Sequence, residues 1–292
     1  MTKLTATLRI AAATFHETIR RRYLNIMLVF ALGMIALSAL FAHLSPGAEL
    51  KMLLDMGIGS IRFFGMLIAV FLGVRMISDE IERRTIDVLL AKPVTRSEFV
   101  VGKFLGGLLT LLLNMAIMTA LFAIVYAIKA PAIQHHGAEA QELGQTTGFE
   151  LGATTINVLV QIVLITFEMA ILVALAVAIS TVASWIFSAI LTLFLWVAGQ
   201  FGGFLDYLAR TTHSHGGEGG SEWASEASPL VRYFAMVTYR LLPHFNQFDV
   251  REAILSNKPI LTGDVAQIVG HAVIYTIVVV AAGCLLFSRR QF

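Results

Sequence analysis

Most of the polar side chains that could do chemistry in this chain interrupt long apolar stretches. Asn157, Gln161 and Glu168 are separated by four and seven residues, which places them on one face of a helix. Arg62, Asn114 and Gln200 are polar residues in three of the other apolar stretches. Polar groups inside a membrane are costly, so these residues either line a pathway or subunit interface or hold helices together by hydrogen bonds. We expect Glu168 to have no cationic partner, because Arg62 lies near the outer end of its stretch.

Two histidine pairs, His135-His136 and His213-x-His215, have side chains that suit copper, nickel or zinc. Neither pair has a nearby cysteine or a carboxylate in a rigid element. We interpret them as solvated loop histidines and predict no metal site, with a metal or a partner on these loops as the alternative. The single cysteine, Cys284, excludes an internal disulfide and a cysteine-based zinc site.

The sequence contains none of the common catalytic motifs. It has no His-Glu-x-x-His zinc helix, no Gly-x-Ser-x-Gly nucleophile elbow and no Gly-x-x-x-x-Gly-Lys-Ser/Thr phosphate loop. The chain therefore cannot bind and hydrolyse ATP through that loop. We predict no catalytic residues, no enzyme activity and no cofactor bound by the chain itself.

The composition is that of an integral membrane protein. Of the 292 residues, 57% are hydrophobic and 14% charged, and the mean hydropathy is +0.79. A soluble domain carries roughly 25% charged residues, so most side chains here face something other than water. The net charge of +2 gives no reason to expect a nucleic acid as partner.

Six apolar stretches are long enough to cross a bilayer as helices, which takes about 20 residues each. They run over about 24–41, 57–77, 104–128, 156–179, 185–205 and 268–287. Lys and Arg residues near the ends of these spans lie mostly on the side that holds the N-terminus, which places both termini in the cytoplasm. We predict an all-α fold of six transmembrane helices, with residues 1–292 as a single domain.

Three segments outside the spans carry further predictions. Residues 1–22 have an apolar stripe, Leu4, Leu8, Ala11, Phe15 and Ile19, that is typical of an amphipathic helix in the membrane interface. Residues 206–267 form a long outer loop, whose apolar part predicts interfacial or re-entrant helices. Gly102-x-x-x-Gly106 predicts close helix packing at the start of the third span.

The segment between the second and third spans predicts a helix, a break and a second helix. Charges crowd residues 79–84, and four apolar residues can share one face, which indicates a short amphipathic helix over 79–92. These four are Ile77, Ile81, Val88 and Leu89. Pro93 ends it, because the residue before proline is disfavoured in a helix. Thr95 and Glu98 then form a capping box that restarts the chain as a helix leading into span three.

This segment resembles the corresponding loop of type-2 ABC transporter permeases. Residues 79–96 show an acidic pair, a Glu-x-Arg-Thr, two leucines and a Pro-Val-x-Arg, with Arg84 where many members carry glycine. The terminal sequence Phe287–Phe292 and the six spans fit as well, so the resemblance covers essentially the full length. Within the family it is closest to exporter permeases of the multidrug, sodium-efflux and nitrous-oxide-reductase-maturation types.

The resemblance implies a function and partners. Residues 79–92 would be the cytoplasmic coupling helix, which docks on a separate ATP-binding subunit. The docking residues would be Asp79, Glu80, Ile81, Glu82, Arg83, Arg84, Thr85, Val88 and Leu89. ATP and magnesium would lie on two copies of that ATPase, and a second permease copy, identical or paralogous, would complete an exporter in the prokaryotic cytoplasmic membrane.

Two alternatives remain open at this point. A secondary transporter with its own coupling ion would use Glu168, although no internal repeat supports it. An ATP-driven subunit that acts on an extracytoplasmic partner through residues 206–267 would use the same coupling segment. The sequence names no substrate, because the polar stripe suits an ion, an amphiphile or a lipid.

Overall fold

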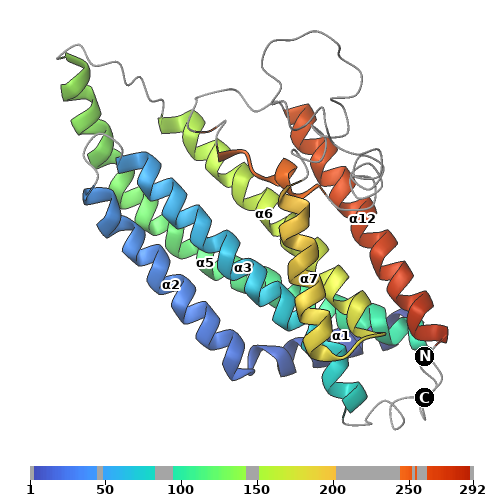
Figure 1. Cartoon of the computed structure of the whole chain (residues 1–292). Helices are drawn as coiled ribbons and strands as arrows, with labels where there is room; N and C mark the ends of the chain where they lie inside the picture. The colour runs from blue at the N-terminus through green and yellow to red at the C-terminus, as the bar shows by residue number, and fades with distance from the viewer. Residues whose placement is uncertain are drawn as a thin grey trace, which may run out of the picture.

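The computed structural model describes residues 3–44, 49–82, 95–142, 151–201, 244–251, 254 and 262–289, and this part of the chain is helical throughout, without strands (Figure 1). The elements are α1 (Lys3–Ile19), α2 (Arg22–His43), α3 (Glu49–Glu82), α5 (Arg96–Glu142), α6 (Leu151–Ser180), α7 (Trp185–Gln200), the short 3-10 helix η1 (Phe245–Phe248) and α12 (Thr262–Arg289). We call the end of the bundle that holds α1 the α1 end, and the end that holds η1 the η1 end.

Five of the six predicted spans coincide with helices that are long and apolar enough to cross a membrane: α2, α3, α5, α6 and α12. The sixth apolar helix, α7, has 16 residues in the described part of the chain. At 1.5 Å per residue that is about 24 Å, which is shorter than a hydrocarbon core of about 30 Å. All five long helices extend beyond their apolar stretches into the polar residues on either side.

Helices α3 and α6 form the centre of the bundle. In each of them 72% of the most apolar window is buried, against 22% in α2 and 11% in α12. The two central helices approach closely, since a Cβ added at Gly73 would lie 2.5 Å from Cβ of Ala176. Polar groups on facing sides of α3 and α6 are therefore shielded from the surroundings of the bundle.

Helix α1 packs on α5 at the end of the bundle near both chain termini (Figure 1). The Gly102-x-x-x-Gly106 prediction of close packing is confirmed, and the partner is α1. A Cβ added at Gly102 would lie 2.8 Å from Cβ of Ile10, and one at Gly106 would lie 2.7 Å from the carbonyl oxygen of Ala11. The two glycines thus provide the groove in which α1 sits.

The predicted helix over 1–22 is present as α1, but its packed face differs from the predicted apolar stripe. Ala11, Thr14 and Thr18 are buried, whereas Leu8 is 56% exposed. The hydroxyl of Thr18 donates to the carbonyl oxygen of Thr14 (2.6 Å), so a buried threonine costs little here. The glycine groove selects small residues, which leaves the Leu8 side of α1 free to face a membrane interface.

The capping box at the start of α5 is confirmed. The amide of Thr95 donates to the Glu98 carboxylate (3.0 Å), and the amide of Glu98 points at the Thr95 hydroxyl (3.4 Å). Helix α3 continues through Asp79 to Glu82, so the first residues of the predicted coupling helix belong to α3. Residues 83–94, including Pro93, lie outside the described residues.

The glycine groove generates a prediction. Gly106→Ala places a methyl group against the backbone of α1, and we expect overpacking to cost about 1–3 kcal/mol and to lower the thermal unfolding midpoint in detergent. Gly33→Ala in α2 is the matched control, because nothing lies within 4 Å of its added Cβ. Equal midpoints for the two variants would contradict the close packing of α1 on α5.

Candidate functional site

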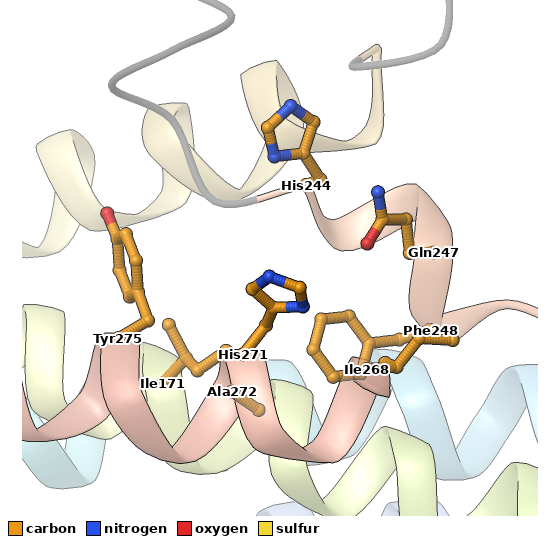
Figure 2. A pocket seen from close by; sticks show the side chains of 8 residues that line it. All are labelled: Ile171, His244, Gln247, Phe248, Ile268, His271, Ala272 and Tyr275. Carbon is orange, nitrogen blue, oxygen red and sulfur yellow. The ribbon is translucent and has the colours of Figure 1, made fainter. Parts of the chain in front are cut away.

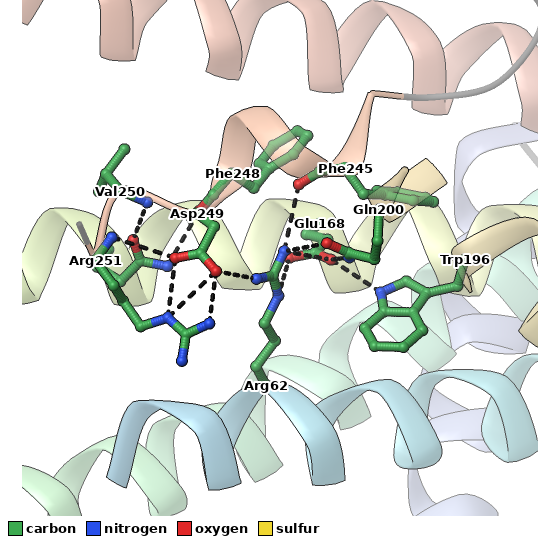
Figure 3. A network of polar contacts seen from close by, with 10 residues as sticks. Arg62, Glu168, Trp196, Gln200, Phe245, Phe248, Asp249, Val250 and Arg251 are labelled. Carbon is green, nitrogen blue, oxygen red and sulfur yellow. Dashed lines mark hydrogen bonds and ion pairs between the residues drawn. The ribbon is translucent and has the colours of Figure 1, made fainter. Parts of the chain in front are cut away.

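A buried ion pair joins the two central helices. Arg62 of α3 donates through Nε to Oε2 of Glu168 in α6 (3.0 Å) and through Nη2 to Oε1 (3.2 Å), a two-pronged contact (Figure 3). The Arg62 side chain is 9% exposed and that of Glu168 is 0% exposed. Arginine suits this site because its planar guanidinium matches a carboxylate with two parallel hydrogen bonds.

The expectation that Glu168 lacks a cationic partner is wrong. It took the second span to begin at about residue 57, whereas α3 begins at Glu49. Arg62 therefore lies about 20 Å along α3, and Glu168 about 26 Å along α6, at 1.5 Å per residue. The two residues occupy similar depths, and the long arginine side chain bridges the remaining difference.

Helix α7 contributes two further partners to the Glu168 carboxylate. Trp196 donates from its indole Nε1 to Oε1 (2.9 Å), and Gln200 donates from its amide to the same oxygen (3.0 Å). The amide oxygen of Gln200 accepts from Arg62 (3.2 Å). Trp196 and Gln200 are one helical turn apart, and that spacing in α7 was a signal that the sequence analysis did not use.

The segment 244–251 reaches the ion pair from outside the central helices. Arg62 Nη1 donates to the Asp249 carboxylate (2.5 Å), and Nη2 donates to the carbonyl oxygen of Phe245 (3.3 Å). Phe245 and Phe248 are 0% and 4% exposed, so η1 buries its aromatic side chains in the bundle. Arg251 in turn contacts Asp249 (2.6 Å). We call residues 244–251 the η1 segment.

Gln161, about two helical turns before Glu168 in α6, anchors the same segment. Its amide nitrogen donates to the carbonyl oxygen of Phe248 (3.1 Å), and its amide oxygen accepts from the backbone N–H of Val250 (2.7 Å). Gln161 and Glu168 thus share a face, as predicted, and both serve the η1 segment. Asn157 is half-buried and takes part in none of these contacts.

Asn114, the other predicted lining residue, does not join the network. It is buried and donates to the carbonyl oxygen of Thr110 in its own helix (2.8 Å). The Asn114 side chain thus bonds within its own helix, which fits a structural role rather than a place in the lining of a pathway.

The four charges of the network, Arg62, Arg251, Glu168 and Asp249, balance to zero. Burial alone would raise the pKa of Asp249, but hydrogen bonds from Arg251 and the charge of Arg62 outweigh it and lower that pKa. Asp249 accepts hydrogen bonds from Arg251 and thereby raises the pKa of the Arg251 guanidinium. Asp249 and Arg251 therefore stay ionised at neutral pH. The network offers no reactive nucleophile, and its contacts attach the η1 segment to the central helices.

A second ion cluster lies at the α1 end and holds two of the predicted docking residues. Asp79 contacts Arg21 and also Arg75 (3.4 Å), and Glu80 contacts Lys103 of α5. Burial alone would lower the pKa of Arg21. Contacts that include its hydrogen bond to Asp79 outweigh burial, so the pKa is raised. Asp79 and Glu80 thus tie α3 to α5 and to the junction between α1 and α2.

The structure describes no side chains for the remaining predicted docking residues. Ile81 and Glu82 belong to the backbone of α3, and Arg83, Arg84, Thr85, Val88 and Leu89 lie outside the described residues. His135 and His136 lie in the last turns of α5 without described side chains, and His213 and His215 lie outside the described residues. Among the side chains that the structure describes, no three His, Cys, Asp or Glu residues gather as metal ligands.

The ion pair generates a stability prediction. Glu168→Gln leaves the buried network with one excess positive charge, and we expect a loss of about 3–5 kcal/mol, seen as a lower thermal unfolding midpoint in detergent. Adding Arg62→Gln removes that excess, so the double variant should recover part of the loss.

Glu17→Gln is the matched control for this experiment. Glu17 is 55% exposed and pairs with Arg21 at 2.7 Å, and surface pairs contribute about 0–1 kcal/mol. A double variant less stable than either single variant, or equal midpoints for Glu168→Gln and Glu17→Gln, would contradict a charge-balanced buried network.

Comparison with known proteins places the chain in a family. No curated protein matches it. Residues 4–292, nearly the whole chain, match the family described as ABC-2 family transporter protein. Together with the long apolar helices, this match makes the chain a multi-pass membrane protein. The match covers the central ion pair, the η1 segment and both chain ends alike. The chain belongs to the ABC-2 transporter family.

Proposed function

We propose that this chain is the membrane-spanning subunit of an ATP-driven exporter, energised by a separate ATP-binding subunit. The observation that carries the proposal is the family match over residues 4–292, in a sequence that contains no phosphate loop. ATP and magnesium then belong to the partner. Two permease copies and two ATPase copies form the working assembly, and the α1 end faces the cytoplasm of a prokaryotic cell.

The α1 end provides the connection to the ATPase. Helix α3 includes the first residues of the segment 79–92, up to Glu82, and the capped helix α5 begins at Arg96 shortly after it, so in this proposal a push on the segment is passed to two long helices. Asp79 and Glu80 are held by Arg21 and Lys103 within the chain. We therefore assign docking to the remaining predicted residues, which are 81–85, 88 and 89, and give Asp79 and Glu80 the role of fixing the base of the coupling segment.

The η1 end provides the barrier to release. In the structure Arg62 joins α3 to Glu168 of α6 and to Asp249 of the η1 segment. Movement of α3 against α6 would strain this pair and loosen the η1 segment above it. ATP binding can drive that movement only if the ATPase binds the two states with different affinity.

Pairing of Glu168 disfavours the alternative of a secondary transporter. A coupling-ion site needs an acid whose charge is free to exchange with the transported ion. Here the carboxylate accepts hydrogen bonds from Arg62, Trp196 and Gln200. An ATP-driven subunit that acts on an extracytoplasmic partner would use the same parts, and measured flux separates it from an exporter.

Copurification tests the ATPase partner. A tagged chain extracted from native membranes in mild detergent should bring a stoichiometric ATP-binding subunit, identified by mass spectrometry. Ile81→Asp with Val88→Asp should abolish it, because both residues lie on the predicted apolar face of the coupling helix.

Leu90→Asp is the matched control, because at 100° per residue Leu90 falls on the side of that helix opposite Ile81. It introduces one negative charge, where the double variant introduces two, and should keep the ATPase bound. If no ATP-binding subunit accompanies the wild-type chain, the proposed function fails.

Cysteine labelling tests the barrier. In a Cys284→Ser background, Phe248→Cys should react slowly with a membrane-impermeant maleimide, because Phe248 is 4% exposed. ATP turnover by the intact complex should accelerate the reaction several-fold as the η1 segment loosens.

Asn246→Cys provides the exposed control on the same short helix and should react at one rate with or without ATP. Equal Phe248→Cys labelling rates with and without turnover would remove the η1 segment from the transport cycle.

A further inference from the structure

A cavity of about 270 Å³ lies between α12, α6 and the η1 segment (Figure 2). It shares Phe248 with the surroundings of the ion network but contains none of the four network charges. Figure 2 shows His271 at its centre, with His244 and Gln247 on one side of it and Tyr275 on another. The transport mechanism proposed above assigns this cavity no role.

The lining combines an apolar floor with a polar rim. Ile171, Phe248 and Ala272 form the floor and are 2%, 4% and 2% exposed. The polar lining residues are His244, Gln247, His271 and Tyr275. Among the lining residues that the structure describes there is no Asp, Glu, Lys or Arg, so these residues recognise a ligand through hydrogen bonds rather than through fixed charge.

The ring of His271 has a defined hydrogen-bonding polarity. Its Nδ1 lies 2.9 Å from the carbonyl oxygen of Gln267, one turn earlier in α12. A carbonyl oxygen can only accept, so Nδ1 carries the proton and Nε2 of the neutral ring is an acceptor. The centre of the cavity therefore calls for a ligand that brings an N–H or O–H donor.

An exposed apolar stripe on α12 adjoins the polar rim. Ile274, Ile277 and Val278 are 63%, 62% and 59% exposed, and they follow His271 along the helix away from the η1 segment. In a bilayer this stripe faces the acyl chains. A ligand that fills the cavity and continues along α12 thus has a hydrogen-bonding head and an apolar tail.

We propose that the cavity binds the headgroup of a membrane lipid that carries a hydrogen-bond donor, with the acyl chains along the exposed stripe of α12. The ammonium of an ethanolamine headgroup and the hydroxyls of a glycerol headgroup both supply such a donor. A choline headgroup supplies none, because its nitrogen bears four carbon substituents. His271 accepts the hydrogen bond, and Gln247 and Tyr275 are placed to contact the rest of the headgroup.

Binding at this site is linked to the position of the η1 segment. His244, Gln247 and Phe248 belong to that segment, so the complete site exists only while the segment is seated on the bundle. A lipid that binds only the seated state stabilises it by an amount that rises with the ratio of lipid concentration to its dissociation constant. This linkage rests on the proposed function of the η1 segment, whereas lipid binding itself does not.

Competitive lipid retention tests the proposal. The purified chain, with any ATPase that accompanies it, is incubated in detergent with equal amounts of phosphatidylethanolamine, phosphatidylglycerol and phosphatidylcholine of identical acyl chains. Native mass spectrometry then counts the retained lipids. We expect several-fold preference for one or both of the first two, and which of them is retained identifies an ammonium or a hydroxyl as the donor.

Three variants make the result specific to this cavity. His271→Phe should abolish the preference, and His271→Asn, which keeps an acceptor, should restore part of it. His271 is exposed, so neither change disturbs the core, and an unchanged thermal midpoint checks this. His43→Phe, at the end of α2, should behave as wild type.

Equal retention of the three lipids, or a preference that survives His271→Phe, would overturn the proposal. Neither outcome bears on the copurified ATPase, so the lipid site and the proposed function can fail separately.

Discussion

Arg62 and Glu168 carry opposite charges inside an apolar bundle, and the need to neutralise them determines the contacts at the η1 end of this protein. Removing an ion from water costs several kcal/mol, and a buried pair is tolerated only when geometry and further hydrogen bonds compensate. Arg62 and Glu168 meet that condition by drawing partners from two other places: Trp196 and Gln200 of α7, and Asp249 beyond η1. The short helix α7 and the η1 segment are thus held against α3 and α6 by polar contacts as well as by apolar packing.

Helix α3 connects this network to the ion cluster at the other end. Arg62 and Asp79 lie about 25 Å apart along one continuous helix of 34 residues. Helix α7 follows α3 over much of that distance, with Arg75 4.3 Å from the ring centre of Trp185 at one end and Trp196 bonded to Glu168 at the other. A displacement of α3 at the α1 end therefore reaches both contacts of α7.

Sequence reasoning located the elements better than it located their contacts. Five of the six apolar spans, the Thr95–Glu98 capping box and the close packing at Gly102 all depend on local rules, and each of these predictions is confirmed. The Arg62–Glu168 pair was missed because the start of the apolar run was taken as the start of the helix, whereas α3 begins earlier, at Glu49. Asp249 was missed because it follows a four-residue helix with no periodicity to reveal which face it presents. The packed face of α1 depends on glycines in another helix, which no pattern within residues 1–22 encodes.

In the proposed function the η1 end is a barrier that must open, and charged side chains suit that role better than apolar ones. Apolar residues of similar volume are often as stabilising as a buried ion pair, or more so, so stability alone gives no reason for Arg62 and Glu168. An apolar seal, however, exposes hydrophobic surface to water whenever it parts. A neutral network of two cations and two carboxylates behaves differently, because water that enters during opening solvates each separated charge. The paired dry state and the separated wet state then differ by a modest free energy, which the binding of ATP to a partner can supply.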